Sequence, residues 1–203
     1  MKCILISQRR DRIESRNESR DALDVRWASL LFDLGFLPIP VCSELANKKN
    51  YISLLKPDGI LLSGGNDLGA EPMRDHSESN LLDYAAAQAL PVLGVCRGMQ
   101  MINHYCGGTL KPVKNHVANR HQLLGEWAKA HHYETVNSYH NQGIYTDTLG
   151  QNLLSLATAP DQVIEALKHN TLPWLGIMWH PEREANPNPA DLHLIQYLFS
   201  KEN

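Results

Sequence analysis

A cysteine framed by two glycines is the residue of this sequence best placed to do chemistry. The stretch GVCRGMQ puts Cys96 between Gly94 and Gly98, after an apolar run and before a helix expected at residues 97–105. A strand, a tight turn that carries a nucleophile and a helix together form a nucleophile elbow with a strained backbone. The positive end of the helix dipole favours the thiolate over the thiol. The alternative is that Cys96 is a small buried apolar residue, as free cysteines commonly are.

A histidine and a glutamate two positions apart could serve this thiol. His180 ends an apolar stretch in MWHPE, and Pro181 biases its backbone towards an extended conformation. Residues two apart in an extended segment project to the same side, so Glu182 can orient the imidazole ring. The three groups then act as nucleophile, base and orienting group. Taken alone, MWHPE could equally be a surface turn with a solvated glutamate.

A glycine pair could supply hydrogen-bond donors for an oxyanion. The stretch SGGND at residues 63–67 follows an apolar run and offers closely spaced backbone N–H groups. We predict that the N–H groups of Gly65 and Arg97 form an oxyanion hole, because the residue after a nucleophile commonly contributes one donor. A tight turn that needs a positive φ would use the same glycines, so this motif alone does not decide between the two.

The elements that must position these residues alternate between strand and helix in the first half of the chain. We expect strands at residues 3–7, 37–41, 58–65 and 90–96, a charged loop at residues 9–20, and helices at residues 22–34 (capped by Asp21), 44–55 and 78–90. Continuous apolar strands between helices predict a mostly parallel sheet that is covered on both faces. The prolines of residues 37–41 indicate that this strand lies at an edge of the sheet or that they mark its ends.

The pattern changes after Gly107. Short strands are expected at residues 132–136, 153–158, 163–168 and 174–178, and a last helix at residues 190–200. His180 then follows a strand end, which is where functional sites gather in α/β sheets. The chain shows no repeat and no linker, so residues 1–203 are predicted to form one domain.

Composition and charge exclude several classes of function. The 203 residues carry a net charge of −3 with both signs interspersed, so we expect no nucleic-acid partner and no membrane partner. The N-terminal apolar stretch is too short for a signal peptide, which predicts a cytoplasmic protein with its four cysteines as free thiols. We expect structural positions for Cys3, Cys42 and Cys106, which lack the framing of Cys96.

Six histidines raise the question of a metal. His104, His116, His121, His131, His132 and His140 show neither HExxH nor another spacing typical of metal ligands. We therefore predict that the protein uses no metal and no cofactor. A histidine metal site remains the alternative.

In order along the chain, SGGND, GVCRGMQ and MWHPE resemble the motifs of the class I glutamine amidotransferase family, in its γ-glutamyl hydrolase branch. The resemblance covers nearly the whole chain. It implies a flavodoxin-like three-layer α/β/α fold with a mostly parallel central sheet. It also implies a hydrolase that cleaves a γ-glutamyl amide through a Cys–His–Glu triad and a γ-glutamyl thioester, and releases glutamate.

Two further stretches are similar to that branch. One is RDHSE at residues 74–78, and the other is VNSYHNQGI at residues 136–144. The resemblance implies a pocket for the glutamyl group that is lined by Asn137, Ser138, His140 and Gln142, with Arg97 and Gln100 beside it. The alternative for the second stretch is a polar loop between strands. Arg74, Asp75 and Glu78 could contact substrate or form a helix cap and a salt bridge.

The leaving group stays open at this stage. Ammonia, an amine, an amino acid or a nucleotide amidate could all leave from the same glutamyl carbonyl. The chain is shorter than usual members of the branch, which argues against a large peptide-like substrate. The alternative function is a glutaminase subunit that supplies ammonia to a separate synthase. The presence of Cys96, His180 and Glu182 argues against a non-catalytic relative.

Overall fold

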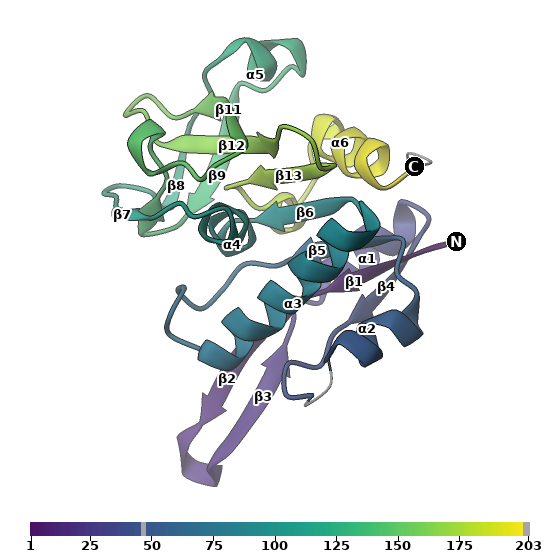
Figure 1. The fold of residues 1–203 in the computed structure, drawn as a ribbon. Coiled ribbons are helices and arrows are strands. Elements are labelled where there is room, and N and C mark those ends of the chain that lie inside the picture. Colours follow the sequence, from purple (N-terminus) through teal and green to yellow (C-terminus); the bar gives the residue numbers. More distant parts are fainter. Residues whose placement is uncertain (46–47, 201–203) are drawn as a thin grey trace.

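A seven-stranded sheet forms the centre of the computed structural model, which describes residues 1–45 and 48–200. Its strands are β1 (Lys2–Ile6), β4 (Phe36–Pro40), β5 (Gly59–Leu62), β6 (Val92–Val95), β11 (Leu153–Thr158), β12 (Ile164–His169) and β13 (Trp174–Ile177). Their order is β11-β12-β13-β6-β5-β1-β4 (Figure 1). The run from β13 to β4 is parallel, whereas β11 and β12 pair antiparallel. The proline-bearing strand β4 lies at an edge, which is one of the two predicted alternatives.

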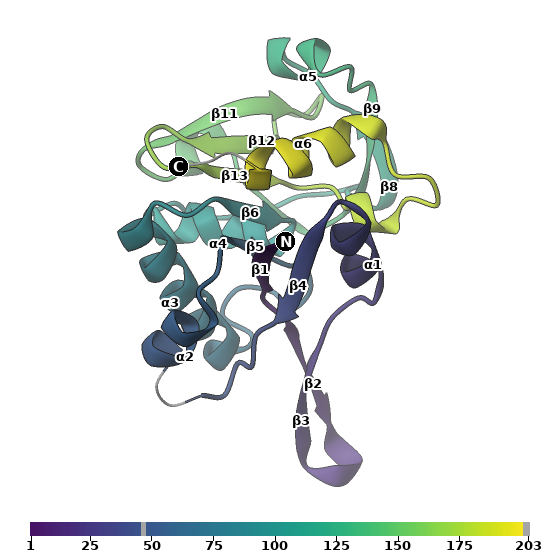
Figure 2. The same ribbon diagram turned by 90° about the vertical axis from the view of Figure 1, so that its right-hand side faces the viewer.

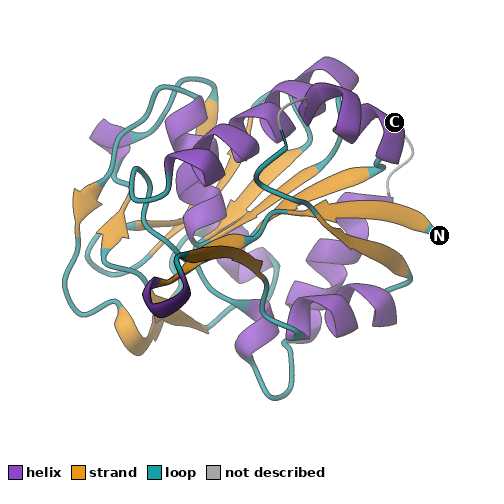
Figure 3. Cartoon of the chain, turned by 90° about the horizontal axis from the view of Figure 1, so that it is seen from below, coloured by secondary structure: helices purple, strands orange, loops and turns teal. Residues whose placement is uncertain are grey.

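Helices cover both faces of the sheet (Figures 2 and 3). They are α1 (Arg26–Asp33) and α6 (Pro189–Ser200) on one face, and α2 (Lys48–Leu55), α3 (Pro72–Gln88) and α4 (Arg97–Tyr105) on the other. Side chains alternate along each strand, so Ile4 of β1 joins Trp27 and Phe199 in one buried cluster, while Leu5 joins Leu82 in the other. The predicted three-layer α/β/α arrangement is confirmed.

Smaller elements lie around this sheet. Three pairs of antiparallel strands are β2 (Arg9–Ile13) with β3 (Glu18–Ala22), β7 (Lys111–Pro112) with β10 (Gln142–Gly143), and β8 (Val117–Gln122) with β9 (Thr135–Tyr139). The short helices are α5 (Glu126–Ala130), η1 (Glu14–Arg16), η2 (Thr146–Thr148) and η3 (Pro181–Arg183). Among the described residues, no helix has both the length and the apolar character that a membrane crossing needs.

The prediction of a charged loop at residues 9–20 was wrong. These residues form the β2–β3 hairpin, which projects away from the sheet (Figures 1 and 2). The register sets Asp11 opposite Arg20, and Asn17 turns the chain with a φ of 48°. Neither strand of the hairpin contains a buried residue, so it lacks the alternation of apolar residues by which strands are recognised. Asp21, expected to cap a helix, instead accepts hydrogen bonds from the Ser43 backbone and hydroxyl.

Several predicted boundaries also move. Helix α1 begins at Arg26, not at residue 22, and α3 begins at Pro72, six residues before the predicted start. Proline suits the first turn of a helix because its missing N–H has no partner to lose there. Residues 44 and 45 are not helical, and the rest of that predicted start, residues 46–47, lies outside the described residues. Residues 132–134 precede β9 and do not belong to it, and β8 was not predicted.

Candidate active site

The backbone at Cys96 has the geometry of the predicted elbow. Strand β6 ends at Val95 and helix α4 begins at Arg97, so Cys96 alone makes the turn, with φ 52° and ψ −107°. A Cβ atom at Gly94 would lie 2.6 Å from the carbonyl oxygen of Gly98, and one at Gly98 would overlap the Leu62 carbonyl. Both glycines are therefore required by the close approach of α4 to the sheet.

His180 follows strand β13 and is held from two sides. Its Nδ1 lies 2.7 Å from Oε1 of Glu182, and both side chains are buried. The Asn137 side chain accepts a hydrogen bond from the His180 N–H at 2.8 Å and donates one to the His180 carbonyl at 2.9 Å. The Glu182 contact fixes the ring, and the Asn137 amide fixes the backbone that carries it.

Cys96 and His180 meet beside Gly64. Strands β6 and β13 are parallel neighbours with Val95 opposite Ile177, so the residues that follow them lie at the same edge of the sheet. A Cβ atom at Gly64 would lie 3.6 Å from Nε2 of His180 and 3.7 Å from Cβ of Cys96. The thiol and the imidazole, which are far apart in the sequence, are thus brought together.

The electrostatic surroundings keep His180 protonated. Burial of the ring lowers the pKa of His180, but hydrogen bonds to Cys96 and Glu182 outweigh burial and raise this pKa to about 9. At neutral pH the ring is therefore an imidazolium between two acidic groups. A ring in that state can give a proton to a departing nitrogen.

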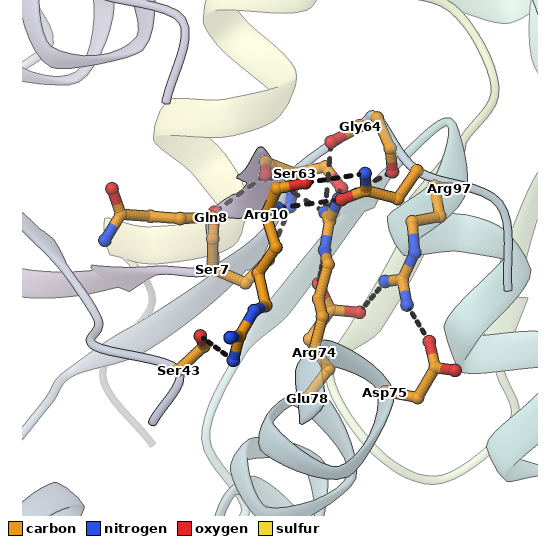
Figure 4. Close-up of polar contacts among 12 residues, drawn as sticks. Ser7, Gln8, Arg10, Ser43, Ser63, Gly64, Arg74, Asp75, Glu78 and Arg97 are labelled. Carbon is orange, nitrogen blue, oxygen red and sulfur yellow. Dashed lines mark hydrogen bonds and ion pairs between the residues drawn. The ribbon is translucent and has the colours of Figure 1, made fainter. Parts of the chain in front are cut away.

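A buried arginine braces the glycine loop (Figure 4). The Arg74 guanidinium, 1% exposed, donates hydrogen bonds to the carbonyls of Ser63 at 2.7 Å, Gly64 at 3.0 Å and Gly65 at 2.6 Å. The N–H of a trans peptide points opposite to its C=O, and no described peptide bond is cis. The Gly65 N–H, which shares a peptide with the Gly64 carbonyl, is therefore directed away from Arg74.

The Arg97 side chain contacts helix α3, whereas its backbone N–H is the predicted oxyanion donor. Its guanidinium forms ion pairs with Asp75 and Glu78 of α3, and it is 2% exposed. Asp75 also accepts a hydrogen bond from the Gly69 N–H, and Glu78 one from Arg74 at 3.0 Å. Residues of RDHSE thus form an ion-pair network between α3 and α4 (Figure 4). Of the two roles considered for Arg74, Asp75 and Glu78, their contacts in the structure are those of a salt bridge.

A cleft of about 290 Å³ opens on the imidazole. Its lining residues include Gly64, Gly65, His180 and Glu182, which come from the candidate site itself. The β2–β3 hairpin adds Arg9 and Asp11, which form an ion pair at 2.7 Å. The short helix η3 adds Arg183, and Asp24 also lines the cleft. The Arg9 side chain is half exposed, and the Arg183 guanidinium stands over the Tyr139 ring at 4.7 Å.

The structure does not bring the predicted glutamyl-pocket side chains to this cleft. Gln100, Asn137, Ser138 and His140 are each 5% exposed or less. Gln100 donates to the Gln142 carbonyl at 2.9 Å, and Ser138 to the His116 carbonyl at 2.6 Å. The Gln142 side chain is partly exposed, and its carbonyl also lies 2.9 Å from Nδ1 of His140. In this structure these residues make hydrogen bonds within the protein, and contact with substrate stays a prediction.

Two contributors, Gly64 and Arg9, were not among the predicted site residues, and Asn137 was predicted in another role. Gly64, next to the predicted Gly65, is the glycine that contacts the His180 ring. Asn137 was predicted as a substrate contact but holds the His180 backbone. Arg9 belongs to a segment expected to be a loop. The Ser-Gly-Gly motif could have indicated Gly64, whereas no local signal indicates where the hairpin points.

Comparison with known proteins gives matches over most of the chain. A model of the family described as Peptidase C26 matches residues 4–182. The chain is 35% identical to the gamma-glutamyl-CDP-amidate hydrolase of Campylobacter jejuni subsp. jejuni serotype O:2, with 96% of each chain covered. It is 27% identical to the gamma-glutamyl-gamma-aminobutyrate hydrolase of Escherichia coli O157:H7, with 91% of this chain and 86% of that protein covered.

Solved structures support the fold. A putative GMP synthase component from Thermoplasma acidophilum is similar with a TM-score of 0.74 and 19% identity, over 98% of this chain and 95% of that chain. A glutamine amidotransferase from Thermotoga maritima follows with a TM-score of 0.66 and 14% identity, over 98% of this chain and 84% of that chain. The predicted fold, branch and enzyme class are therefore confirmed: the chain is an enzyme of the Peptidase C26 family, built on the fold of the class I glutamine amidotransferases.

Proposed function

We propose that this protein hydrolyses a γ-glutamyl amide, with Cys96 as nucleophile, His180 as proton donor and acceptor, and Glu182 as the orienting group. The observation that carries the proposal is the buried His180 ring, which contacts Glu182 on one side and Cys96 on the other. The names of two similar proteins describe γ-glutamyl hydrolases, which supports the same bond as the target.

The proposed reaction has two halves. The Cys96 thiolate attacks the γ-carbonyl, and the N–H groups of Gly65 and Arg97 stabilise the oxyanion. One such donor is typically worth about 2.7–4 kcal/mol. The His180 imidazolium protonates the leaving nitrogen as the C–N bond breaks, which leaves a γ-glutamyl thioester on Cys96. His180 then takes a proton from water, hydroxide attacks the thioester, and glutamate leaves while the thiolate is restored. No metal or cofactor enters these steps.

We propose γ-glutamyl-CDP-amidate as the substrate, with cytidine diphosphoramidate as the leaving group, which would place the enzyme in capsule modification. The similarity to the Campylobacter jejuni protein over 96% of both chains supports this choice. Arg9 and Arg183 line the cleft and suit a diphosphate that displaces Asp11 from its ion pair with Arg9. The short chain argues against larger peptide-like substrates.

A panel of γ-glutamyl compounds tests the proposal. The purified chain alone should hydrolyse a γ-glutamyl nucleotide amidate faster than glutamine or γ-glutamyl-γ-aminobutyrate. Cys96→Ala should abolish turnover without a change in circular dichroism, and intact mass spectrometry of the quenched wild type should show a glutamyl adduct on Cys96. Cys42→Ala, at an exposed thiol, is the matched control and should keep full activity.

Two results would contradict the proposal. Normal hydrolysis by Cys96→Ala would exclude the nucleophile. Glutamine hydrolysis that appears only when a synthase is added would instead support the alternative of a glutaminase subunit, with ammonia as the product.

A further inference from the structure

Three histidines and a glutamate that are spread along the second half of the sequence meet behind the cleft. His116 precedes β8, His121 lies in β8, His140 follows β9 and Glu165 lies in β12. Sequence reasoning predicted no metal here because their spacing matches no ligand motif. Tertiary folding nevertheless brings their four donor atoms within 4.8 Å of one another.

Four distances among these donor atoms are close to those of a coordination shell, and no pair lies more than 4.8 Å apart. Nδ1 of His116 and Nε2 of His121 each lie 3.5 Å from Oε1 of Glu165. Nε2 of His140 lies 3.4 Å from the same oxygen and 3.1 Å from Nδ1 of His116. In a tetrahedral site with bonds of about 2.0–2.1 Å, neighbouring ligand atoms are about 3.3–3.4 Å apart. The nitrogens are too far from Oε1 for ordinary N–H···O hydrogen bonds, which are about 2.7–3.2 Å long.

The outer nitrogens of His116 and His140 have acceptors at ordinary hydrogen-bond distance, and the outer nitrogen of His121 has a longer contact. Nε2 of His116 lies 3.0 Å from the Asp161 carboxylate, and Nδ1 of His140 lies 2.9 Å from the Gln142 carbonyl. Nδ1 of His121 lies 3.3 Å from the Gln122 carbonyl. A neutral ring that donates its outer N–H presents a lone pair on its inner nitrogen. In known metal sites, carboxylate or carbonyl acceptors bind the outer N–H of the ligating histidines in this way and fix the tautomer of each ring.

Three inner atoms of the cluster lack a hydrogen bond to any described residue, whereas Nδ1 of His116 and Nε2 of His140 lie 3.1 Å apart and can share one. Among the described residues, none donates to either oxygen of Glu165, and Nε2 of His121 has no partner. Glu165 is 0% exposed, and an isolated buried carboxylate is costly. A proton on His116, shared with His140, would relieve the repulsion between those two rings. It would leave Nε2 of His121 unsatisfied, whereas a cation at the centre serves all four donors.

We propose that His116, His121, His140 and Glu165 bind one divalent metal ion, with Zn²⁺ as the best match. Three imidazole nitrogens and one carboxylate oxygen in this spacing suit tetrahedral zinc, whereas Mg²⁺ and Ca²⁺ prefer all-oxygen sites. The three neutral rings, the ion and Glu165 carry a net charge of +1, which Asp161 behind His116 offsets. Four protein ligands close the shell, as in structural rather than catalytic zinc sites.

The proposed ion would tie the β8–β9 hairpin to the central sheet. Three ligands come from that hairpin and its ends, and the fourth comes from β12. The hairpin also carries Asn137, which holds the His180 backbone, and the Glu165 carbonyl accepts a hydrogen bond from the Met178 N–H at 2.8 Å. The ion would therefore hold the β8–β9 hairpin, and with it Asn137, in place against the proposed active site.

Metal analysis and titration of untagged protein test the inference. The full chain should contain, or bind after chelation and dialysis, one Zn²⁺ per molecule, and X-ray absorption should show imidazole ligands at about 2.0–2.1 Å. His121→Ala removes the least buried ligand, whose side chain is 12% exposed, and should weaken Zn²⁺ binding at least about 100-fold. Glu165→Gln provides a second variant, and circular dichroism shows whether each folds.

The matched control is His104→Ala, an exposed histidine of α4 outside the cluster. This variant should bind Zn²⁺ as tightly as wild type. Chelation should lower the melting temperature of wild type and His104→Ala by about 5 °C or more, and leave folded His121→Ala unchanged. Wild-type protein that binds no stoichiometric Zn²⁺, or equal affinities for wild type and His121→Ala, would overturn the inference. NMR detection of a metal-independent proton between His116 and His140 would then support the imidazolium.

Discussion

The protonation state of His180 decides when the proposed chemistry can run. Its raised pKa, about 9, results from contacts with Cys96 and Glu182 that outweigh burial. Below this value the ring is an imidazolium and can protonate a leaving nitrogen, and above it the ring is neutral. We therefore expect kcat/KM for an amide substrate to fall as the pH rises through about 9.

The variant Glu182→Gln tests the cause of this fall in kcat/KM at alkaline pH. Glu182→Gln removes the negative charge beside Nδ1 but keeps a side chain of similar shape, so the alkaline limb should shift to lower pH. Rates measured between pH 6 and 10 check both expectations. A limb at the same pH in wild type and Glu182→Gln would show that Glu182 does not tune the ring.

Gly64 is a second position where a single added carbon atom should change the catalytic rate. A Cβ atom there would lie 2.7 Å from Cε1 of His180, so Gly64→Ala must displace the ring. Misplacement of a catalytic group by about 1 Å can cost about 100-fold in rate. We expect kcat to fall by about that factor with little change in melting temperature, as steady-state kinetics and thermal unfolding would show. Activity within twofold of wild type would mean that the ring does not depend on this contact.

Helix α3 matters as an element because it carries the arginine that orders the glycine loop. Arg74 holds three successive carbonyls and pairs with Glu78 in the protein interior. Removal of one partner of a buried ion pair typically costs about 3–5 kcal/mol. Arg74→Met should lower the free energy of unfolding by an amount in that range, and should also lower kcat because the Gly65 N–H loses its orientation.

Two comparisons separate loop positioning from plain stability. Arg74→Lys keeps the charge but not the planar fork, so it should recover stability more than kcat. Arg12→Ala removes an exposed ion pair with Glu14 and should change the free energy of unfolding by less than about 1 kcal/mol. Equal recovery of stability and kcat in Arg74→Lys would indicate a purely structural role.

At the scale of the whole molecule, the projecting hairpin β2–β3 forms part of the wall of the cleft. It is anchored at its base, where the Arg10 backbone and the Asn66 side chain exchange hydrogen bonds at 2.8 and 3.0 Å. Arg9→Ala should therefore raise the KM for a nucleotide amidate about tenfold and leave the KM for glutamine unchanged, because a hydrogen bond to a charged group is worth about 1.5–3 kcal/mol.

Arg16, in the exposed turn of the same hairpin, offers the control. Arg16→Ala removes the same charge from the molecule and should leave both KM values unchanged. Equal effects of Arg9→Ala on the two substrates would indicate that the hairpin does not recognise the nucleotide.

Local rules of the chain allowed the elbow and the His–Glu contact to be predicted. Cys96 must turn in one residue between a strand and a helix, and neighbouring glycines are the mark of that turn. His180 and Glu182 are two positions apart, so an extended backbone suffices to bring them together. The continuous apolar strands between helices likewise indicated the layers of the fold, because both faces of such strands must be buried by helices.

Contacts between distant segments were decided only by the tertiary structure. Arg97 turns its side chain to Asp75 and Glu78, and Asn137 holds His180 instead of facing the cleft. The hairpin at residues 9–22 has no apolar side to reveal it in the sequence. Sequence spacing limits only the reach of the chain. Which polar groups become partners depends on how strands and helices pack, because a buried polar group takes the partner that packing places beside it.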